Sequence, residues 1–193
     1  MTTAAVNSNA TAGKPSGKVL TDEMIAEIKA FFPRYPSKQA VTLPALHIVN
    51  EKLRYVPYQA VVEVAELLEL HPAVVQDTLS FYGYFKQDKP HGHVRAWVCR
   101  SIACHLRGAD GILEHFCERL HLAPGETTND GAITVEYAEC LGACEYAPCI
   151  LANETLHKCV TKDSIEEIVM GARVNHAISS APSSVSPNNS TNR

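Results

Sequence analysis

Two pairs of cysteines are the residues of this sequence best suited to carry chemistry. Four residues separate Cys99 from Cys104, three separate Cys140 from Cys144, and 35 residues lie between the pairs. Cysteine thiolates are soft ligands that select zinc, copper(I) and iron–sulfur clusters. If both pairs meet at one place in the fold, they supply the four thiolates of a single metal centre.

The segments that precede the pairs determine whether the pairs can meet. Residues 94–98 and 133–137 alternate apolar with polar side chains, which predicts a β-strand ending just before each pair. Apolar residues at helical spacing predict a helix over about 107–120, between the two strands. Strand, helix and strand in this order favour two parallel neighbours, whose carboxyl ends lie at the same edge of a sheet. We therefore expect the two pairs to converge.

Three kinds of thiol site can be weighed against this spacing. Zinc sites favour C-x₂-C knuckles and thioredoxin-type redox sites need C-x-x-C, but neither gap here is two residues. The first pair has the C-x₄-C half of the plant-type [2Fe–2S] ferredoxin pattern, although the second half differs. Gly142 and Ala143 also suit a cluster, because they let backbone N–H groups approach the sulfurs. A [2Fe–2S] cluster is favoured, and a zinc-stapled structural module and a thiol enzyme remain as alternatives.

The three other cysteines and the nearest histidine are interpreted separately. Cys117 and Cys159 are expected to be small core residues. Cys149 could lie close to the cluster, where we expect it to be a spectator because four thiolates already complete the site. His105 is expected not to be a ligand, because Rieske clusters need two histidines paired with two cysteines.

The composition limits the other functions of the chain. Its 193 residues carry a formal net charge of −4 and no Lys/Arg-rich run, so no nucleic-acid partner is expected. No run of about 18 apolar residues predicts membrane insertion. The lack of a signal-peptide pattern and the odd count of seven cysteines favour a reducing, cytoplasmic compartment. Neither a Walker A loop nor G-x-G-x-x-G occurs, so no site for NADH or a flavin is expected on this chain.

The pattern also divides the chain into two ordered parts between two tails. Residues 1–17 and 175–193 are rich in small polar residues and are expected to be disordered. Residues 18–88 indicate a small bundle of four helices, the first capped by Thr21 and the others over about 37–53, from Pro57 and from Pro72. The aromatic residues that end this bundle are expected to pack in its core and could also form a docking face: Phe81, Tyr82, Tyr84 and Phe85.

The second ordered part, residues 89–174, has a different pattern. After the two strands and their helix, two further short strands are expected around a hairpin at Asn153-Glu154. A last helix is expected from about Lys162. This order of elements predicts an α/β domain with one mixed sheet.

Several segments together resemble the family of the 24-kDa subunit of respiratory complex I, the NADH–quinone oxidoreductase of bacteria. They are residues 57–85, C-R-S-I-A-C-H-L-R-G, P-G-E-T-T, E-C-L-G-A-C-E-Y-A-P-C and D-S-I-E-E-I-V. The resemblance covers roughly residues 21–172. It implies a thioredoxin-like domain after a helical bundle, holding one [2Fe–2S] cluster. By position, its ligands would be Cys99, Cys104, Cys140 and Cys144.

The resemblance also implies a role beside other subunits. Members of that family bind a flavin subunit that carries FMN and oxidises NADH, and their cluster exchanges single electrons with the flavin. The chain would then be an iron–sulfur subunit of an NADH dehydrogenase, peripheral on the cytoplasmic arm and not catalytic alone. Equivalent subunits of NAD-reducing hydrogenases and NAD-dependent formate dehydrogenases share these motifs. The sequence departs from the family at residues 100–103 and at Cys149, where family members often have methionine.

Overall fold

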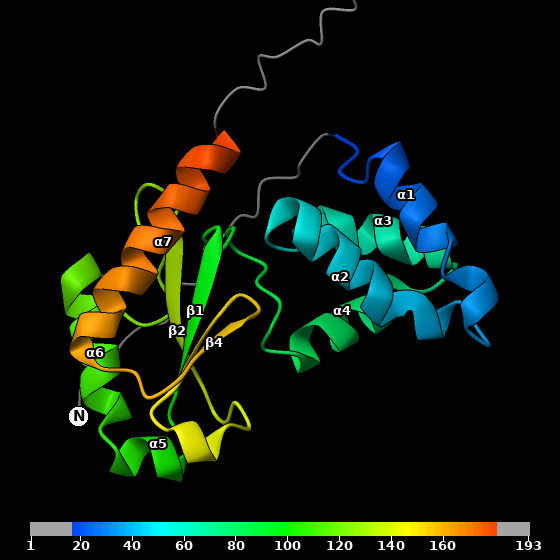
Figure 1. The fold of residues 1–193 in the computed structure, drawn as a ribbon. Coiled ribbons are helices and arrows are strands. Elements are labelled where there is room, and N and C mark those ends of the chain that lie inside the picture. The colour runs from blue at the N-terminus through cyan, green and yellow to red at the C-terminus, as the bar shows by residue number, and fades with distance from the viewer. Residues whose placement is uncertain (1–16, 181–193) are drawn as a thin grey trace, which may run out of the picture. The chain divides into compact units, whose positions relative to one another are not determined.

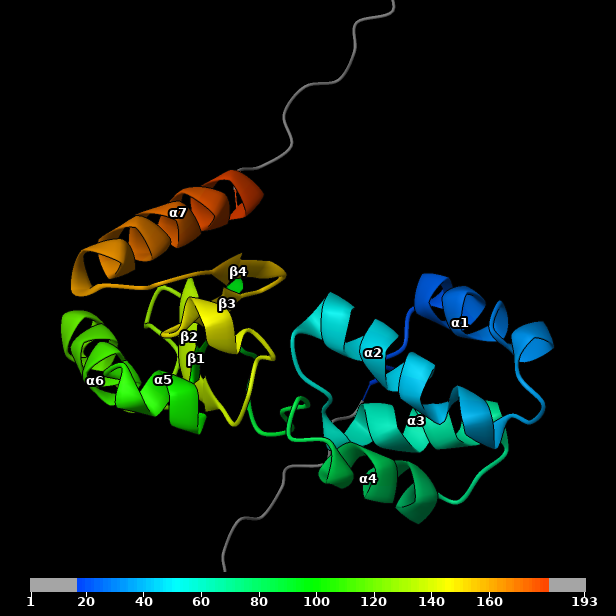
Figure 2. The same cartoon turned by 60° about the horizontal axis from the view of Figure 1, so that its bottom comes forward.

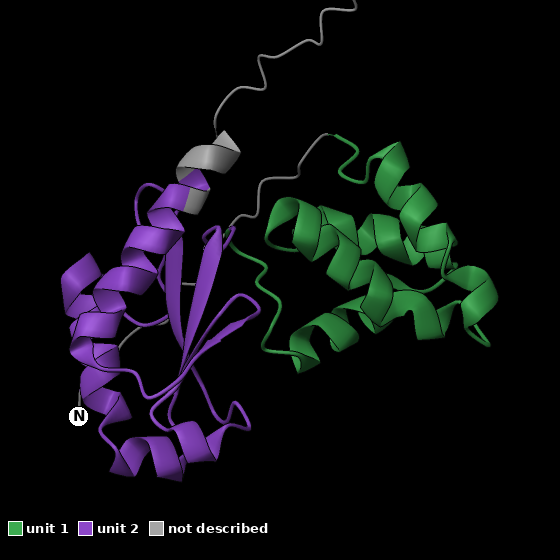
Figure 3. Ribbon diagram, viewed as in Figure 1, with its two compact units in different colours: residues 1–89 green, residues 90–193 purple. Residues whose placement is uncertain are grey.

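The computed structural model describes residues 17–180 of the chain. The chain divides after Lys89 into two compact units, called unit 1 and unit 2 below (Figure 3). The tails expected over 1–17 and 175–193 fall mostly outside the described residues. Within the described residues, none of the helices combines the length and the apolar character needed to cross a bilayer.

The described residues of unit 1 form four short helices, as the sequence predicts (Figure 1): α1 Asp22–Lys29, α2 Thr42–Leu53, α3 Tyr58–Leu68 and α4 Pro72–Phe81. The Thr21 hydroxyl caps α1 by accepting a hydrogen bond from the backbone N–H of Met24 at 3.2 Å. The second helix begins at Thr42 rather than near Ser37, because Pro44 has no N–H and is tolerated only in a first turn. Two 3₁₀ turns, Phe32–Arg34 and Gln39–Val41, precede it.

The core of unit 1 is built from the apolar faces of these helices, with side chains that include Met24, Ile28, Leu46, Val49, Val61, Val64 and Leu68. The prediction that the aromatic cluster packs in this core is wrong for three of its four residues. Phe85 is 7% exposed, but Phe81 is 79% exposed and both Tyr82 and Tyr84 are exposed. The helical spacing ends with α4 at Phe81, so the residues after it no longer share one inward face.

Unit 2 is built around a mixed sheet of four strands, as predicted: β1 Val94–Cys99, β2 Ile133–Ala138, β3 Ile150–Ala152 and β4 Thr155–His157. Their order in the sheet is β2-β1-β3-β4. Strands β1 and β2 are parallel, whereas β3 pairs antiparallel with both β1 and β4. The expected hairpin turns at Asn153, which has a positive φ of 51°.

Two helices pack on one face of this sheet, α6 Ala109–Leu120 and α7 Lys162–Ser180 (Figures 1 and 2). The helix expected over about 107–120 is α6, and a second, unpredicted helix, α5 Ile102–Leu106, precedes it; Gly108, with φ 87°, separates the two. The last helix begins at Lys162 as expected and continues to Ser180. This helix includes residues 175–180, and the remainder of the tail expected from Asn175 lies outside the described residues.

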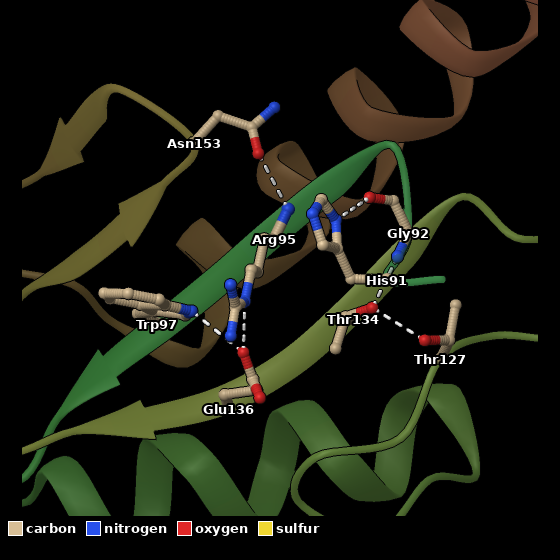
Figure 4. A network of polar contacts seen from close by, with 8 residues as sticks. All are labelled: His91, Gly92, Arg95, Trp97, Thr127, Thr134, Glu136 and Asn153. Atoms are coloured by element: carbon tan, nitrogen blue, oxygen red, sulfur yellow. Dashed lines mark hydrogen bonds and ion pairs between the residues drawn. The ribbon is translucent and has the colours of Figure 1, made fainter. Parts of the chain in front are cut away.

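A polar network fixes the register of β1 against β2 (Figure 4). The Arg95 guanidinium forms an ion pair with the Glu136 carboxylate, and both side chains are buried. Trp97 Nε1 donates to the same carboxylate at 3.0 Å, and the Arg95 guanidinium lies 4.7 Å from the centre of the Trp97 ring. Asn153 connects the β3–β4 turn to this network, because its Oδ1 accepts a hydrogen bond from the backbone N–H of Arg95 at 2.8 Å. A slip of one residue would move these side chains to the opposite face of the sheet.

We predict that Glu136→Leu lowers the free energy of unfolding by about 3 kcal/mol or more, because it removes the carboxylate that faces the buried Arg95 charge. The double variant Arg95→Met/Glu136→Leu removes both charges and should regain most of that loss. Urea unfolding followed by the fluorescence of Trp97, the single tryptophan, measures both changes. Equal losses in the single and the double variant would contradict this explanation, because the double variant leaves no unpaired Arg95 charge.

Candidate metal centre

Both cysteine pairs follow strands that end at the same edge of the sheet. Strands β1 and β2 are paired in parallel up to Cys99, which lies opposite Ala138. Beyond this point the backbone N–H of Arg100 still donates to the Ala138 carbonyl, at 2.9 Å. The chain then enters α5, which lies beside the 3₁₀ turn Cys144–Tyr146 at this end of unit 2 (Figures 1 and 2). The parallel arrangement predicted from the sequence is confirmed.

The first pair is buried. Cys99 is the last residue of β1 and is 2% exposed, and Cys104 lies in α5 and is 1% exposed. Burial raises the pKa of Cys104 to about 12, against the hydrogen bond from the backbone N–H of Cys149, and the neighbouring thiols of Cys99 and Cys149 raise it further. A bound metal cation would have the opposite effect and lower the pKa of this thiol, because a thiol that coordinates a metal is deprotonated outright.

The second pair is exposed. Cys140 and Cys144 lie on a loop in which Gly142 adopts φ 72° and donates its backbone N–H to the Cys140 sulfur at 3.4 Å. This hydrogen bond, followed by one from the Ser101 side chain, lowers the pKa of Cys140. The negative charge of Cys140 is the largest cause of the raised pKa of Cys144. Since metals bind the thiolate form, Cys140 is the thiol of this pair more readily prepared to bind one.

The loops that carry the two pairs touch each other. Ser101, which precedes α5 on the first loop, interacts through its side chain with the Cys140 thiol of the second loop. The charge of Cys99 is also close enough to raise the pKa of Cys144. Ser101 was not singled out from the sequence; a hydroxyl two residues after Cys99 and just before a helix was the available signal.

The sulfurs approach one another as pairs. Within residues 17–180, no three or more His, Cys, Asp or Glu side chains form a group that could hold a single metal ion. The interacting thiols are Cys99 with Cys104, Cys140 with Cys144, and Cys104 with Cys149. In a [2Fe–2S] cluster each of the two irons takes two protein ligands. The donor type and the pairing of the thiols therefore fit this cluster.

The other cysteines have unlike surroundings. Cys117 is buried among core side chains of unit 2, as predicted. The core assignment of Cys159 is wrong: β4 ends at His157, and Cys159 is exposed with φ 48°. It follows the short strand instead of belonging to it, because its backbone N–H bonds to the Tyr146 carbonyl at 2.8 Å. Cys149 is 1% exposed, with its sulfur beside that of Cys104.

Two polar side chains near the cysteines, those of His105 and Arg100, have partners of their own. The His105 ring lies 2.7 Å from the Asp110 carboxylate, and both side chains are more than half exposed. Arg100 forms an ion pair with Glu139, the residue before Cys140, and its guanidinium stacks 3.9 Å from the centre of the Tyr137 ring. This ion pair is a second link between the two loops.

Comparison with known proteins assigns a family to this fold and site. The profile of the thioredoxin-like [2Fe–2S] ferredoxin family matches residues 28–173. NADH-quinone oxidoreductase subunit 2 of Thermus thermophilus is 34% identical over 145 residues, which cover 74% of this chain and 80% of the relative. A subunit of the NADH-quinone oxidoreductase of Rhizobium meliloti is 35% identical over 134 residues, covering 69% of this chain and 79% of the relative.

Solved structures resemble the fold of the chain. A chain of an NAD⁺-reducing [NiFe]-hydrogenase superposes with a TM-score of 0.61 at 23% identity. The match covers 73% of the present chain and spans about a quarter of the hydrogenase chain, 24%. The family profile extends over parts of both units and over both cysteine pairs. The chain therefore belongs to the thioredoxin-like [2Fe–2S] ferredoxin family.

Proposed function

We propose that this chain is the electron-transfer subunit of an NADH–quinone oxidoreductase. One [2Fe–2S] cluster would be held by Cys99 and Cys104 from the first loop and by Cys140 and Cys144 from the second. The observation that carries this proposal is the parallel pairing of β1 and β2, which brings the two loops to one edge of the sheet. The relatives at 34% and 35% identity are named as subunits of that enzyme.

The chemistry of the bound group is one-electron transfer, at a potential set by hydrogen bonds to sulfur and by solvent exposure. The residues of this chain supply both. The backbone N–H of Gly142 points at the Cys140 sulfur and favours its negative charge. Burial of Cys99 and Cys104 keeps water from one half of the site, while Cys140 and Cys144 leave the other half open.

The exposed half offers a place for an electron-transfer partner. Helix α5 carries Ile102 and Leu106 four residues apart on one face, and both are more than three quarters exposed. Tyr137 and Tyr146, which flank the second loop in sequence, are also exposed. Large apolar side chains at the surface are typical of protein interfaces. We infer that a subunit carrying FMN and NADH docks on α5 and the second loop, on the cytoplasmic arm of the complex.

The helical bundle of unit 1 is proposed to bind other subunits of the complex. The aromatic residues that end and follow α4 are not used by its core: Phe81, Tyr82 and Tyr84. Tyr58 at the start of α3 is 62% exposed as well. Aromatic side chains supply much of the energy of protein interfaces, so these positions suit a contact with another chain.

The alternative proposal is that this chain is the equivalent subunit of an NAD-reducing hydrogenase. The likeness to the hydrogenase chain, at 23% identity, is one of fold. The names of the sequence relatives favour the quinone-linked enzyme. The two proposals differ in the chains that co-purify with the natively expressed protein: flavin and quinone-linked subunits in the first, and a [NiFe] subunit in the second.

We predict that Cys140→Ala lowers the cluster content by about tenfold or more, because it removes a proposed ligand. Cys117→Ala is the matched control: it changes a buried cysteine of the helical face and should perturb packing but leave the cluster in place. Iron, acid-labile sulfide and the paramagnetic signal of the reduced protein, all measured after anaerobic purification, report the outcome. Equal cluster content in the two variants would contradict the ligand assignment.

A second prediction tests the docking face. Ile102→Glu/Leu106→Glu should abolish co-purification with the flavin subunit, because burying two charges opposes association. Both side chains are exposed, so the iron content of the variant should equal that of the wild type. Wild-type protein bound to the flavin subunit should show the paramagnetic signal of the reduced cluster after anaerobic addition of NADH. Unchanged complex formation by the double variant would refute this docking face.

A further inference from the structure

A fifth thiol lies within the candidate metal centre. The sulfur of Cys149 is 3.8 Å from the sulfur of Cys104, and both side chains are only 1% exposed. The two residues are 45 positions apart in sequence, so the fold brings them together. Neither the spacing of the four proposed ligands nor their pairing needs this thiol.

The position of Cys149 is fixed from both sides. Its carbonyl accepts a hydrogen bond from the backbone N–H of Cys99 at 3.1 Å. Its thiol donates to the carbonyl of Ala143, the residue before Cys144, at 3.5 Å. The next residue, Ile150, begins β3 and is paired with Val98 of β1. Cys149 is therefore held between the two cysteine loops by the same sheet that positions them.

The separation of the two sulfurs is that of two ligands on one metal. In a tetrahedral site with metal–sulfur bonds of about 2.3 Å, two thiolates lie about 3.8 Å apart. Cys104 and Cys149 already have this separation, 3.8 Å, without a change of backbone or rotamer. The Cys104 sulfur also interacts with the thiol of Cys99, so two thiols lie beside the same proposed ligand.

We propose that Cys149 is a reserve ligand, which can replace Cys99 and hold one iron together with Cys104. This inference rests on the proposed cluster. In the exchange the iron–sulfur bond to Cys99 breaks and one to Cys149 forms. The Cys149 proton is released and Cys99 takes up one. No electron is gained or lost, so the exchange needs no oxidant or reductant. The site then has five thiols for four positions.

Four variants of the full chain test the proposal: Cys99→Ala, Cys149→Ala, the double variant and Cys140→Ala. Alanine is used because a serine oxygen could itself bind iron. Cys149→Ala should contain as much iron and sulfide as the wild type. Cys99→Ala should retain its cluster, with shifted g-values in the reduced state, whereas the double variant should lose it by about tenfold or more. Cys140→Ala should be as empty as the double variant, because the sulfur beside that of Cys149 is Cys104 of the other pair.

Two results would overturn the proposal. One is a Cys99→Ala protein as empty as the double variant; the other is a double variant that keeps the cluster of Cys99→Ala. If Cys99→Ala does not fold, Cys99→Ser answers the same question by resonance Raman spectroscopy. Ligation by four sulfurs supports Cys149, and ligation by three sulfurs and an oxygen refutes it. A wild type without iron and sulfide would instead refute the proposed function, so the two failures are distinguishable.

Discussion

The parallel pairing of β1 and β2 is the constraint on which the rest of the site depends. Because the two strands run in the same direction and stay in register to Cys99 and Ala138, the chain leaves both at one edge. The loops that follow carry all four proposed ligands. The buried contact between Arg95 and Glu136 opposes a slip in this register, earlier in the same two strands. Core packing of α6 and α7 and the polar network therefore serve one geometric purpose, which is to keep two loops together.

The two halves of the site differ in their contact with water. Cys99 and Cys104 are buried and lie on a strand end and a short helix, whereas Cys140 and Cys144 are exposed on a loop that needs a left-handed glycine. The buried half is held by regular secondary structure. The exposed half is accessible to a partner for electron transfer. Charge added to the site on reduction would be stabilised better on the solvent side, because water and the Gly142 N–H both favour it.

Much of this arrangement follows from the sequence. Alternating residues defined β1 and β2, helical spacing defined α6, and together they imply parallel strands with the cysteines at one edge. Two features were not accessible in that way. The short helix α5 lies inside the first cysteine loop, and five residues are too few to show a period. Cys159 was assigned to the core because it was placed in a strand, but β4 ends at His157 and the residue lies in a left-handed turn.

The contact between Cys104 and Cys149 could not be predicted from sequence either. It depends on how β3 pairs with β1, which brings residue 149 back beside a loop that it does not follow. The aromatic residues after α4 illustrate the same limit, since their type indicated burial and only the end of the helix determined that they are exposed. Local patterns predict elements well. The side-chain contacts of residues at the ends of those elements depend on tertiary structure.

The central claim is that the two cysteine loops jointly hold a binuclear iron–sulfur cluster. Its most direct test is the iron and acid-labile sulfide content of anaerobically purified protein, with electron paramagnetic resonance after reduction by dithionite. Two irons and two sulfides per chain and one spin-½ signal are expected. A colourless protein with one zinc, or one in which the four cysteines form disulfides, would contradict the claim.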